Sequence, residues 1–251
     1  MDTTFPKYIQ RPSIVGNTTA QMKLITSDYK RRFDTVLVRE GGVCHYRLYK
    51  DGNDYYAFIK VPSEVVPSFY YDVVIKFKGT LLNRVLGSLK TYNIQVFAND
   101  PAFCFTYAYS FNKNKLLIPE LSPKIGDDFL KQRAIDRNPR NAIGIVKSLF
   151  FAYFIMEREK LFDKDKWEKA QDYDAKTLIK QLQYAPDKIA ERQKIGKQVA
   201  ERKKRNKPSY QSGPKPQTFS PTMNVKPVKK TKRTSTISSI KSVKKIGGRK
   251  K

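Results

Sequence analysis

The net charge of this 251-residue chain is concentrated at its C-terminal end, which limits how much of the chain can fold. Residues 188–251 hold 21 Lys and Arg but only two acidic residues, Glu191 and Glu201, so they carry +19 of the total net charge of +27. Such a segment repels itself and buries too little apolar surface to offset the entropy cost of ordering. We therefore expect a basic helix over residues 186–205 and a disordered, Lys-rich tail over residues 206–251.

This basic region predicts a polyanionic partner. Clusters of Lys and Arg recur along it with no acidic residue after Glu201, and spaced clusters on a flexible chain can follow phosphates without a fixed geometry. Release of the counterions condensed on nucleic acid would supply the affinity. We expect nucleic acid as the partner, with DNA favoured over RNA. The candidate nucleic-acid-binding residues are Arg202, Lys203, Lys204, Arg205, Lys229, Lys230, Lys232, Arg233, Lys244, Lys245, Arg249, Lys250 and Lys251.

Two other partners compete for the same charge. An anionic membrane surface would suit the three-residue spacing of Ile237, Ile240, Val243 and Ile246, although this segment lacks the large aromatic anchors that such helices usually carry. The second alternative is a protein–protein assembly module whose tail docks on an acidic partner. Nucleic acid remains the favoured partner.

The stretch Pro101–Phe111 alternates aromatic and small residues, which predicts a strand with one aromatic face. The five rings could lie in a core, or they could form a platform on which the bases of a single strand stack. We favour the core, because aromatic residues at strand spacing are usually buried. Tyr109 and Phe111 are the expected exceptions. The rings are Phe103, Phe105, Tyr107, Tyr109 and Phe111.

The remaining pattern predicts an α+β fold over residues 31–185, preceded by an extended N-terminal arm over residues 1–30 with at most a short strand near Met22–Thr26. We expect a mainly antiparallel sheet of five to seven strands, covered by a buried helix and followed by short helices. Tyr70–Lys78 is expected to be half solvated, and a short helix or turn is expected at Thr80–Leu89. The other expected strands are Thr35–Arg39, Val43–Tyr49, Tyr55–Val61 and Tyr92–Ala98, with an additional short strand at Leu116–Ile118.

The buried helix is expected over Asn141–Leu161, because Asn138 and Pro139 resemble an N-cap followed by proline in the first turn. The small residues Gly144, Ser148 and Ala152 would face the sheet. A second, shorter helix is expected after Asp174 as its N-cap and up to Tyr184.

No pattern in the chain predicts a catalytic or metal site. Asp127 and Asp128 follow Gly126, as in the metal motif of polymerase palms, but a helix start is the favoured interpretation. Two further carboxylate pairs, Asp163/Asp165 and Asp172/Asp174, lie in polar, solvated segments. Cys44 and His45 are adjacent, so on a strand they would point to opposite faces. With two Cys and one His, no four-ligand zinc site of sulfur and imidazole can form. We expect no enzyme activity and no cofactor.

The start of the chain has no apolar signal segment, and its longest apolar run, Leu149–Met156, is too short to span a bilayer. We therefore expect no membrane span, reduced thiols and a cytoplasmic location.

Two stretches resemble structural proteins encoded by tailed bacteriophages. The first runs from Phe97 through Asn99, Asp100 and Pro101 to Tyr109, and the second is 137–141, Arg-Asn-Pro-Arg-Asn. The resemblance covers roughly residues 33–185. It implies a virion or DNA-associated structural component rather than a catalyst, located in the host cytoplasm and the virion, with other virion proteins or copies of itself as further partners. It transfers no site residue.

Overall fold

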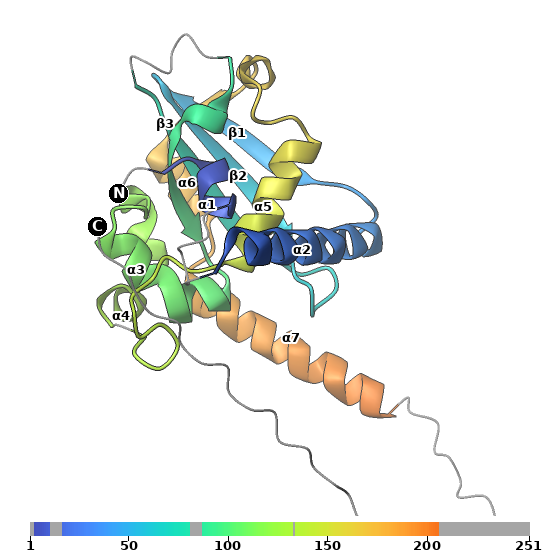
Figure 1. Ribbon diagram of the computed structural model, residues 1–251. Coiled ribbons are helices and arrows are strands. Elements are labelled where there is room, and N and C mark those ends of the chain that lie inside the picture. Colours follow the sequence, from blue (N-terminus) through green and yellow to red (C-terminus); the bar gives the residue numbers. More distant parts are fainter. Residues whose placement is uncertain (1–2, 11–16, 81–86, 133, 206–251) are drawn as a thin grey trace, which may run out of the picture. The chain divides into compact units, whose positions relative to one another are not determined.

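The computed structural model describes residues 3–10, 17–80, 87–132 and 134–205. These residues form an α+β fold around a five-stranded mixed sheet with the strand order β4-β3-β2-β1-β5 (Figure 1). Strands β1 and β5 are parallel, and the other neighbours are antiparallel. The strands are β1 (His45–Asp51), β2 (Asp54–Pro62), β3 (Tyr70–Lys78), β4 (Asn93–Ala98) and β5 (Gln171–Asp172). The predicted α+β fold class is confirmed, and the five strands described lie within the expected five to seven.

Helices lie before, between and after these strands along the chain. The α-helices are α1 (Phe5–Gln10), α2 (Thr19–Arg39), α3 (Ala108–Lys113), α4 (Asp127–Lys131), α5 (Lys147–Arg158), α6 (Ala175–Gln181) and α7 (Ala185–Arg205). Short 3-10 helices lie at η3 (Leu89–Thr91), η5 (Pro119–Lys124) and η6 (Lys164–Trp167), and η4 (Phe103–Tyr107) is a π-helix.

The β1–β2 hairpin and β3 have nearly the bounds that their alternation predicted. The turn between β1 and β2 contains Gly52, whose positive φ of 56° suits a residue without a Cβ. The expectation that β3 is half solvated was wrong, because the strand is buried along most of its length on both faces. Its run of Val73, Val74 and Ile75 is typical of a strand covered on both sides.

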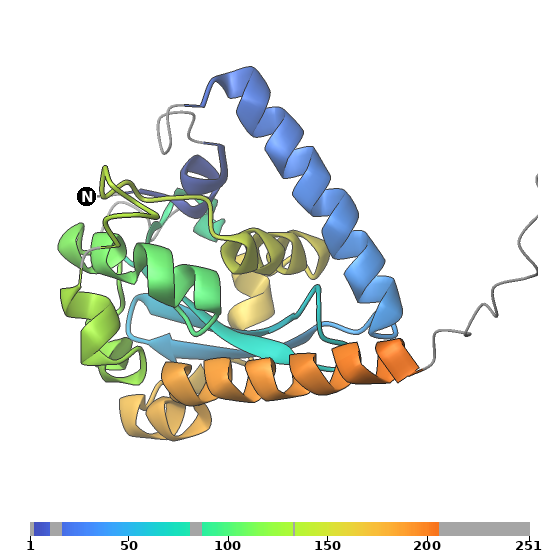
Figure 2. The same cartoon turned by 90° about the horizontal axis from the view of Figure 1, so that it is seen from below.

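One face of the sheet packs against α5, which is the buried helix expected from the sequence (Figure 2). All nine residues from Ser148 to Met156 are buried, so α5 is enclosed on every side. Helix α2 packs on α5, with the ring of Phe33 against Phe151 at 5.4 Å and against Phe154 at 5.8 Å. Sheet, α5 and α2 therefore form successive layers around the main core.

The opposite face of the sheet is covered by η5, α6 and the segment between η6 and α6. The rings of Tyr56 and Tyr173 stack there at 3.8 Å, and both hydroxyl groups donate to the carboxylate of Glu120. Tyr49 on β1 donates to the side chain of Gln181 on α6 at 2.9 Å. These polar contacts hold the second layer while the aromatic rings are buried.

The expected extended arm over residues 1–30 and the expected strand Thr35–Arg39 are both corrected by the structure. Helix α1 occupies part of the arm, and α2 runs from Thr19 through the expected strand. A capping box starts α2, in which Thr18 and Gln21 exchange backbone and side-chain hydrogen bonds. The buried Met22, Phe33 and Leu37 have the spacing of a helix. The alternation of Thr35–Arg39 is typical of a strand and concealed this helical spacing.

The expected aromatic strand Pro101–Phe111 is helical, and this is the largest error of the sequence interpretation. The side chain of Asp100 accepts a hydrogen bond from the Phe103 amide at 3.0 Å, and Pro101 follows as the first helical residue. A π-helical turn then leads into α3. The buried residues of the stretch are Phe103, Cys104, Ala108, Ser110 and Phe111, which lie on one side of a helix rather than on one face of a strand.

Helix α5 starts at Lys147, six residues later than expected, because the preceding segment forms a loop instead of the first helical turns. Asn138 does not cap it. Its buried amide instead donates to Ser110 and to the carbonyl of Ala142, which orders the loop before the helix. Gly144 lies in this loop, where an added Cβ would come within 1.8 Å of the Tyr107 ring, so glycine is required for that contact.

Of the shorter elements expected from the sequence, one is corrected and one is confirmed by the structure. Leu117 forms a single parallel bridge with Val96 instead of a strand. Asp174 caps α6 as expected, by accepting from the amides of Lys176 and Thr177. Most of the segment expected as a helix or turn at Thr80–Leu89 lies outside the described residues, as does the expected tail, residues 206–251.

Substitutions in the aromatic stretch should separate buried from exposed rings. Phe103→Ala and Phe111→Ala should each lower the free energy of unfolding by about 3–5 kcal/mol, because each removes a fully buried ring. Phe105→Ala is the matched control. Phe105 is 41% exposed, so its loss should cost about 1 kcal/mol. Urea unfolding of the three variants measures this, and equal losses at all three positions would contradict the helical arrangement.

Candidate nucleic-acid interface

Helix α7 corresponds to the predicted basic helix, and its first half packs against the domain (Figure 2). Ala185 and Ile189 belong to the main core, and Ile195 packs against a small cluster of Val66, Phe69 and Tyr71. The ammonium group of Lys188 lies 4.2 Å from the centre of the Phe69 ring. The helix is therefore fixed by three apolar residues and one cation–π contact.

The exposed face of α7 is cationic. Lys194, Lys197 and Arg202 are exposed, and the basic residues at the helix end also suit the negative end of the helix dipole. Of the thirteen candidate binding residues, Arg202 is thus confirmed as an exposed helical residue. Residues 203–205 complete the helix, although their side chains lie outside the described part of the structure. The other nine candidates, Lys229, Lys230, Lys232, Arg233, Lys244, Lys245, Arg249, Lys250 and Lys251, also lie outside it.

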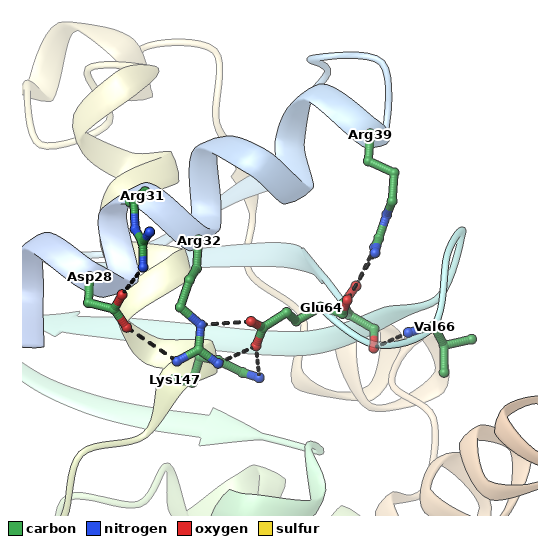
Figure 3. Close-up of polar contacts among 8 residues, drawn as sticks. Asp28, Arg31, Arg32, Arg39, Glu64, Val66 and Lys147 are labelled. Atoms are coloured by element: carbon green, nitrogen blue, oxygen red, sulfur yellow. Dashed lines mark hydrogen bonds and ion pairs between the residues drawn. The ribbon is translucent and has the colours of Figure 1, made fainter. Parts of the chain in front are cut away.

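A second group of cations, which the sequence interpretation missed, surrounds the carboxylate of Glu64 in the β2–β3 loop (Figure 3). Arg32 on α2 donates to both carboxylate oxygens, from Nε at 2.7 Å and from a terminal nitrogen at 2.6 Å. Lys147, the first residue of α5, donates to the same carboxylate at 2.7 Å. One acidic side chain thereby ties the β2–β3 loop to two helices.

Two more arginines of α2 extend this group along the helix (Figure 3). Arg39 donates to the backbone carbonyl oxygens of Ser63 and Glu64, which fixes the start of the β2–β3 loop. Arg31 pairs with Asp28 at 2.7 Å, but its side chain is 79% exposed and remains accessible to a partner. Together these arginines line an open groove of about 550 Å³ beside α2.

The charge of Glu64 is stabilised by these contacts. Hydrogen bonds from Arg32, and then from Lys147, outweigh the opposing effect of desolvation and lower the pKa of Glu64 to about 2. Glu64 is therefore ionised at neutral pH and compensates part of the surrounding positive charge. The three arginines of α2 pair with three carboxylates, Asp28, Glu40 and Glu64, so the positive charge in excess here is that of Lys147.

The sequence did contain a signal for this group. Lys30, Arg31 and Arg32 are consecutive, and Asp28 and Asp34 lie four residues from Arg32 and Lys30, the spacing of ion pairs on a helix. The signal was lost because residues 1–30 were interpreted as an extended arm and Thr35–Arg39 as a strand, which divided the helix between two elements. The contribution of Lys147 had no local signal, since it depends on tertiary packing.

The five rings of 103–111 do not form a stacking platform on one surface. Phe103 and Phe111 are buried and contact each other at 5.1 Å, which confirms the core interpretation for these two. Tyr107 and Tyr109 are partly buried. Phe105 is exposed, with Phe129 at its edge and the guanidinium of Arg137 5.8 Å from its centre. Two expectations for single rings are therefore wrong: Phe111, expected as an exception, is buried, and Phe105, expected in the core, is exposed.

The structure places the carboxylate and thiol motifs as follows. Asp127 and Asp128 open α4, as expected, and Asp127 pairs with Lys131 at 2.6 Å. Burial raises the pKa of the Cys44 thiol to about 11, so it is not an activated nucleophile. Within the described residues, no three His, Cys, Asp or Glu side chains gather as metal ligands. The described helices include none long and apolar enough to cross a bilayer.

No family model, curated protein or solved structure matches this chain. The function proposed below therefore depends on the residues of the chain alone.

Replacing Glu64 tests how much its ion pairs with Arg32 and Lys147 contribute to the stability of the fold. Glu64→Gln removes the charge that pairs with Arg32 and Lys147, and should lower the free energy of unfolding by about 1–2 kcal/mol at pH 7. Because the pKa of Glu64 is lowered in the folded state, this stabilisation is complete above its ordinary value near 4.5 and is lost as the pH falls toward about 2.

Urea unfolding at several pH values tests this expectation. The difference between wild type and Glu64→Gln should shrink between pH 5 and pH 3. Asp127→Asn is the control. Both side chains of the Asp127–Lys131 pair are exposed, so the pair should contribute almost nothing to the free energy of unfolding. A difference that stays constant down to pH 3 would show that the lost stability does not come from the charge.

Proposed function

We propose that this protein is a non-enzymatic, nucleic-acid-associated structural or accessory protein that contacts nucleic acid through its basic C-terminal region. The observation that carries the proposal is the exposed cationic face of α7, which leads directly into a segment without any acidic residue. Residues 206–251 add 13 Lys and Arg to this face. The counterions that they would displace supply an affinity that needs no fixed geometry.

The cations beside α2 support the same proposal. Arg31 on the folded domain is 79% exposed, and a guanidinium group suits the oxygens of a phosphate better than an ammonium group does. Arg32 and Arg39 line the same groove but are held by Glu64 and by the β2–β3 loop. Arg39 of α2 and Ile195 of α7 both contact the β2–β3 loop, so the two cationic groups adjoin the same segment. A nucleic acid that binds the basic region would find further cations there.

The proposed nucleic acid is DNA in preference to RNA. On the basis of the resemblance to tailed-phage proteins, the proposed place of action includes the virion. Two rival functions remain distinct. A single-strand binder would use exposed rings, of which Phe105 beside Arg137 is the best placed. An assembly module would use the basic region to dock on an acidic protein.

The test compares full-length chains that differ only in charge. In one variant the 13 Lys and Arg of residues 206–251 are replaced by Gln. In a matched variant the exposed domain cations Arg31, Lys194 and Lys197 are replaced by Gln. Binding to duplex DNA, single-stranded DNA and RNA is titrated at several salt concentrations, and the melting temperature is measured for each chain.

Neutralising residues 206–251 should weaken binding most and flatten the dependence of log K on log salt, with an unchanged melting temperature. The domain variant should show a smaller loss in the same direction. Unchanged binding after tail neutralisation would move the site to the domain, and loss of single-strand binding in Phe105→Ala would then favour stacking. Failure of the wild type to bind any of the three at physiological salt would favour the assembly module.

A further inference from the structure

A cavity of about 170 Å³ lies where the β2–β3 loop, the start of α5 and helix α7 meet, apart from the exposed face of α7. Its walls are partly apolar, from Tyr71, Phe151 and Ala102, and partly charged. This volume is enough for several water molecules but is smaller than the pockets that hold a whole drug-sized ligand. The cavity therefore suits a small chemical group rather than a nucleoside.

The two carboxylates that line the cavity are already satisfied. Glu64 accepts three hydrogen bonds from Arg32 and Lys147. Asp100 accepts from the amide of Phe103 on one oxygen and from the hydroxyl of Ser148 on the other. Neither acid has a carboxylate oxygen without a donor, so neither requires a cation from outside.

One buried group at the cavity wall, a donor, has no partner among the described residues. The Nε of Arg192 on α7 is buried and has no hydrogen-bond partner among the described residues. A buried donor without an acceptor costs free energy, more so on a charged group. Lys147 and Ser148 also line the cavity, and they are the first two residues of α5, whose N-cap residue provides no side-chain hydrogen bond. The start of a helix of this length favours an anion.

We propose that this cavity binds a phosphoryl group, held by the guanidinium of Arg192, the ammonium of Lys147 and the start of α5. An oxyanion would supply the acceptor that the Nε of Arg192 lacks, since the other contact of this side chain within the described part of the chain is a hydrogen bond with Tyr71. A tetrahedral group also offers oxygens to several donors at once. The phosphoryl group comes either from free inorganic phosphate or from a phosphate of a nucleic acid. The proposal does not depend on the proposed function, because inorganic phosphate alone tests it.

The experiment measures binding of inorganic phosphate to the full-length chain by calorimetry, and the shift in melting temperature relative to chloride at equal ionic strength. Arg192→Gln removes the unpaired donor. Lys194→Gln, two residues further along α7, removes the same charge from an exposed position and is the matched control. Ala102→Leu leaves every charge in place but adds bulk at an exposed residue of the cavity wall.

We expect one phosphate to bind the wild type and Lys194→Gln equally and to stabilise both. Arg192→Gln and Ala102→Leu should each bind at least tenfold more weakly. Equal binding by Arg192→Gln and Lys194→Gln would overturn the proposal, as would no binding to the wild type. If Arg192→Gln does not fold, Ala102→Leu decides alone, and unchanged binding in that variant would overturn the proposal.

A second arm separates the two sources of the phosphoryl group. Single-stranded oligonucleotides with and without a 5′-phosphate are titrated against wild type and Ala102→Leu. If the terminal phosphate of a nucleic acid occupies the cavity, the phosphorylated strand should bind the wild type several-fold more tightly than the unphosphorylated strand, and Ala102→Leu should abolish the difference. An unchanged preference in Ala102→Leu would assign the cavity to free phosphate, whereas overall nucleic-acid affinity tests the proposed function separately.

Discussion

The packing of α5 against the sheet is the interaction on which the rest of the domain depends. A helix that is apolar all round cannot remain at a surface, so it must be enclosed by other elements. The sheet covers one side and α2 covers another, with the rings of Phe33, Phe151 and Phe154 in contact. Because α2 buries its own apolar stripe mainly against α5, loss of that contact would expose apolar surface on both helices.

The start of α5 is also where the polar interactions of the domain converge. Ser148 donates to Asp100 at the end of β4, and Lys147 donates to Glu64 in the β2–β3 loop. Each carboxylate therefore joins α5 to a segment that is distant in the sequence. Arg31, which pairs with Asp28 instead, keeps a mostly exposed side chain at the surface of a domain that carries net positive charge.

The β2–β3 loop relates the two cationic groups of the domain to each other. Arg39 of α2 holds the carbonyl groups at the start of the loop, and Ile195 of α7 packs against Val66 further along. Helix α2 is positioned mainly by α5, and α7 by the main core and by the cluster around Val66, so the loop is a segment that both helices contact. The loop therefore contacts both helices that carry exposed cations, Arg31 on α2 and Lys194 and Lys197 on α7.

The sequence by itself determined the elements whose evidence is local: the β1–β2 hairpin, β3, the Asp174 cap of α6 and the basic helix α7. Only the tertiary structure decided Pro101–Phe111, because a spacing of four satisfies both a strand face and a helix stripe, and the Asp100 cap and the burial of the stretch select the helix. The same holds for the cluster around Glu64. Arg32 and Lys147 are far apart in the chain, and no spacing rule relates them until α2 and α5 pack together.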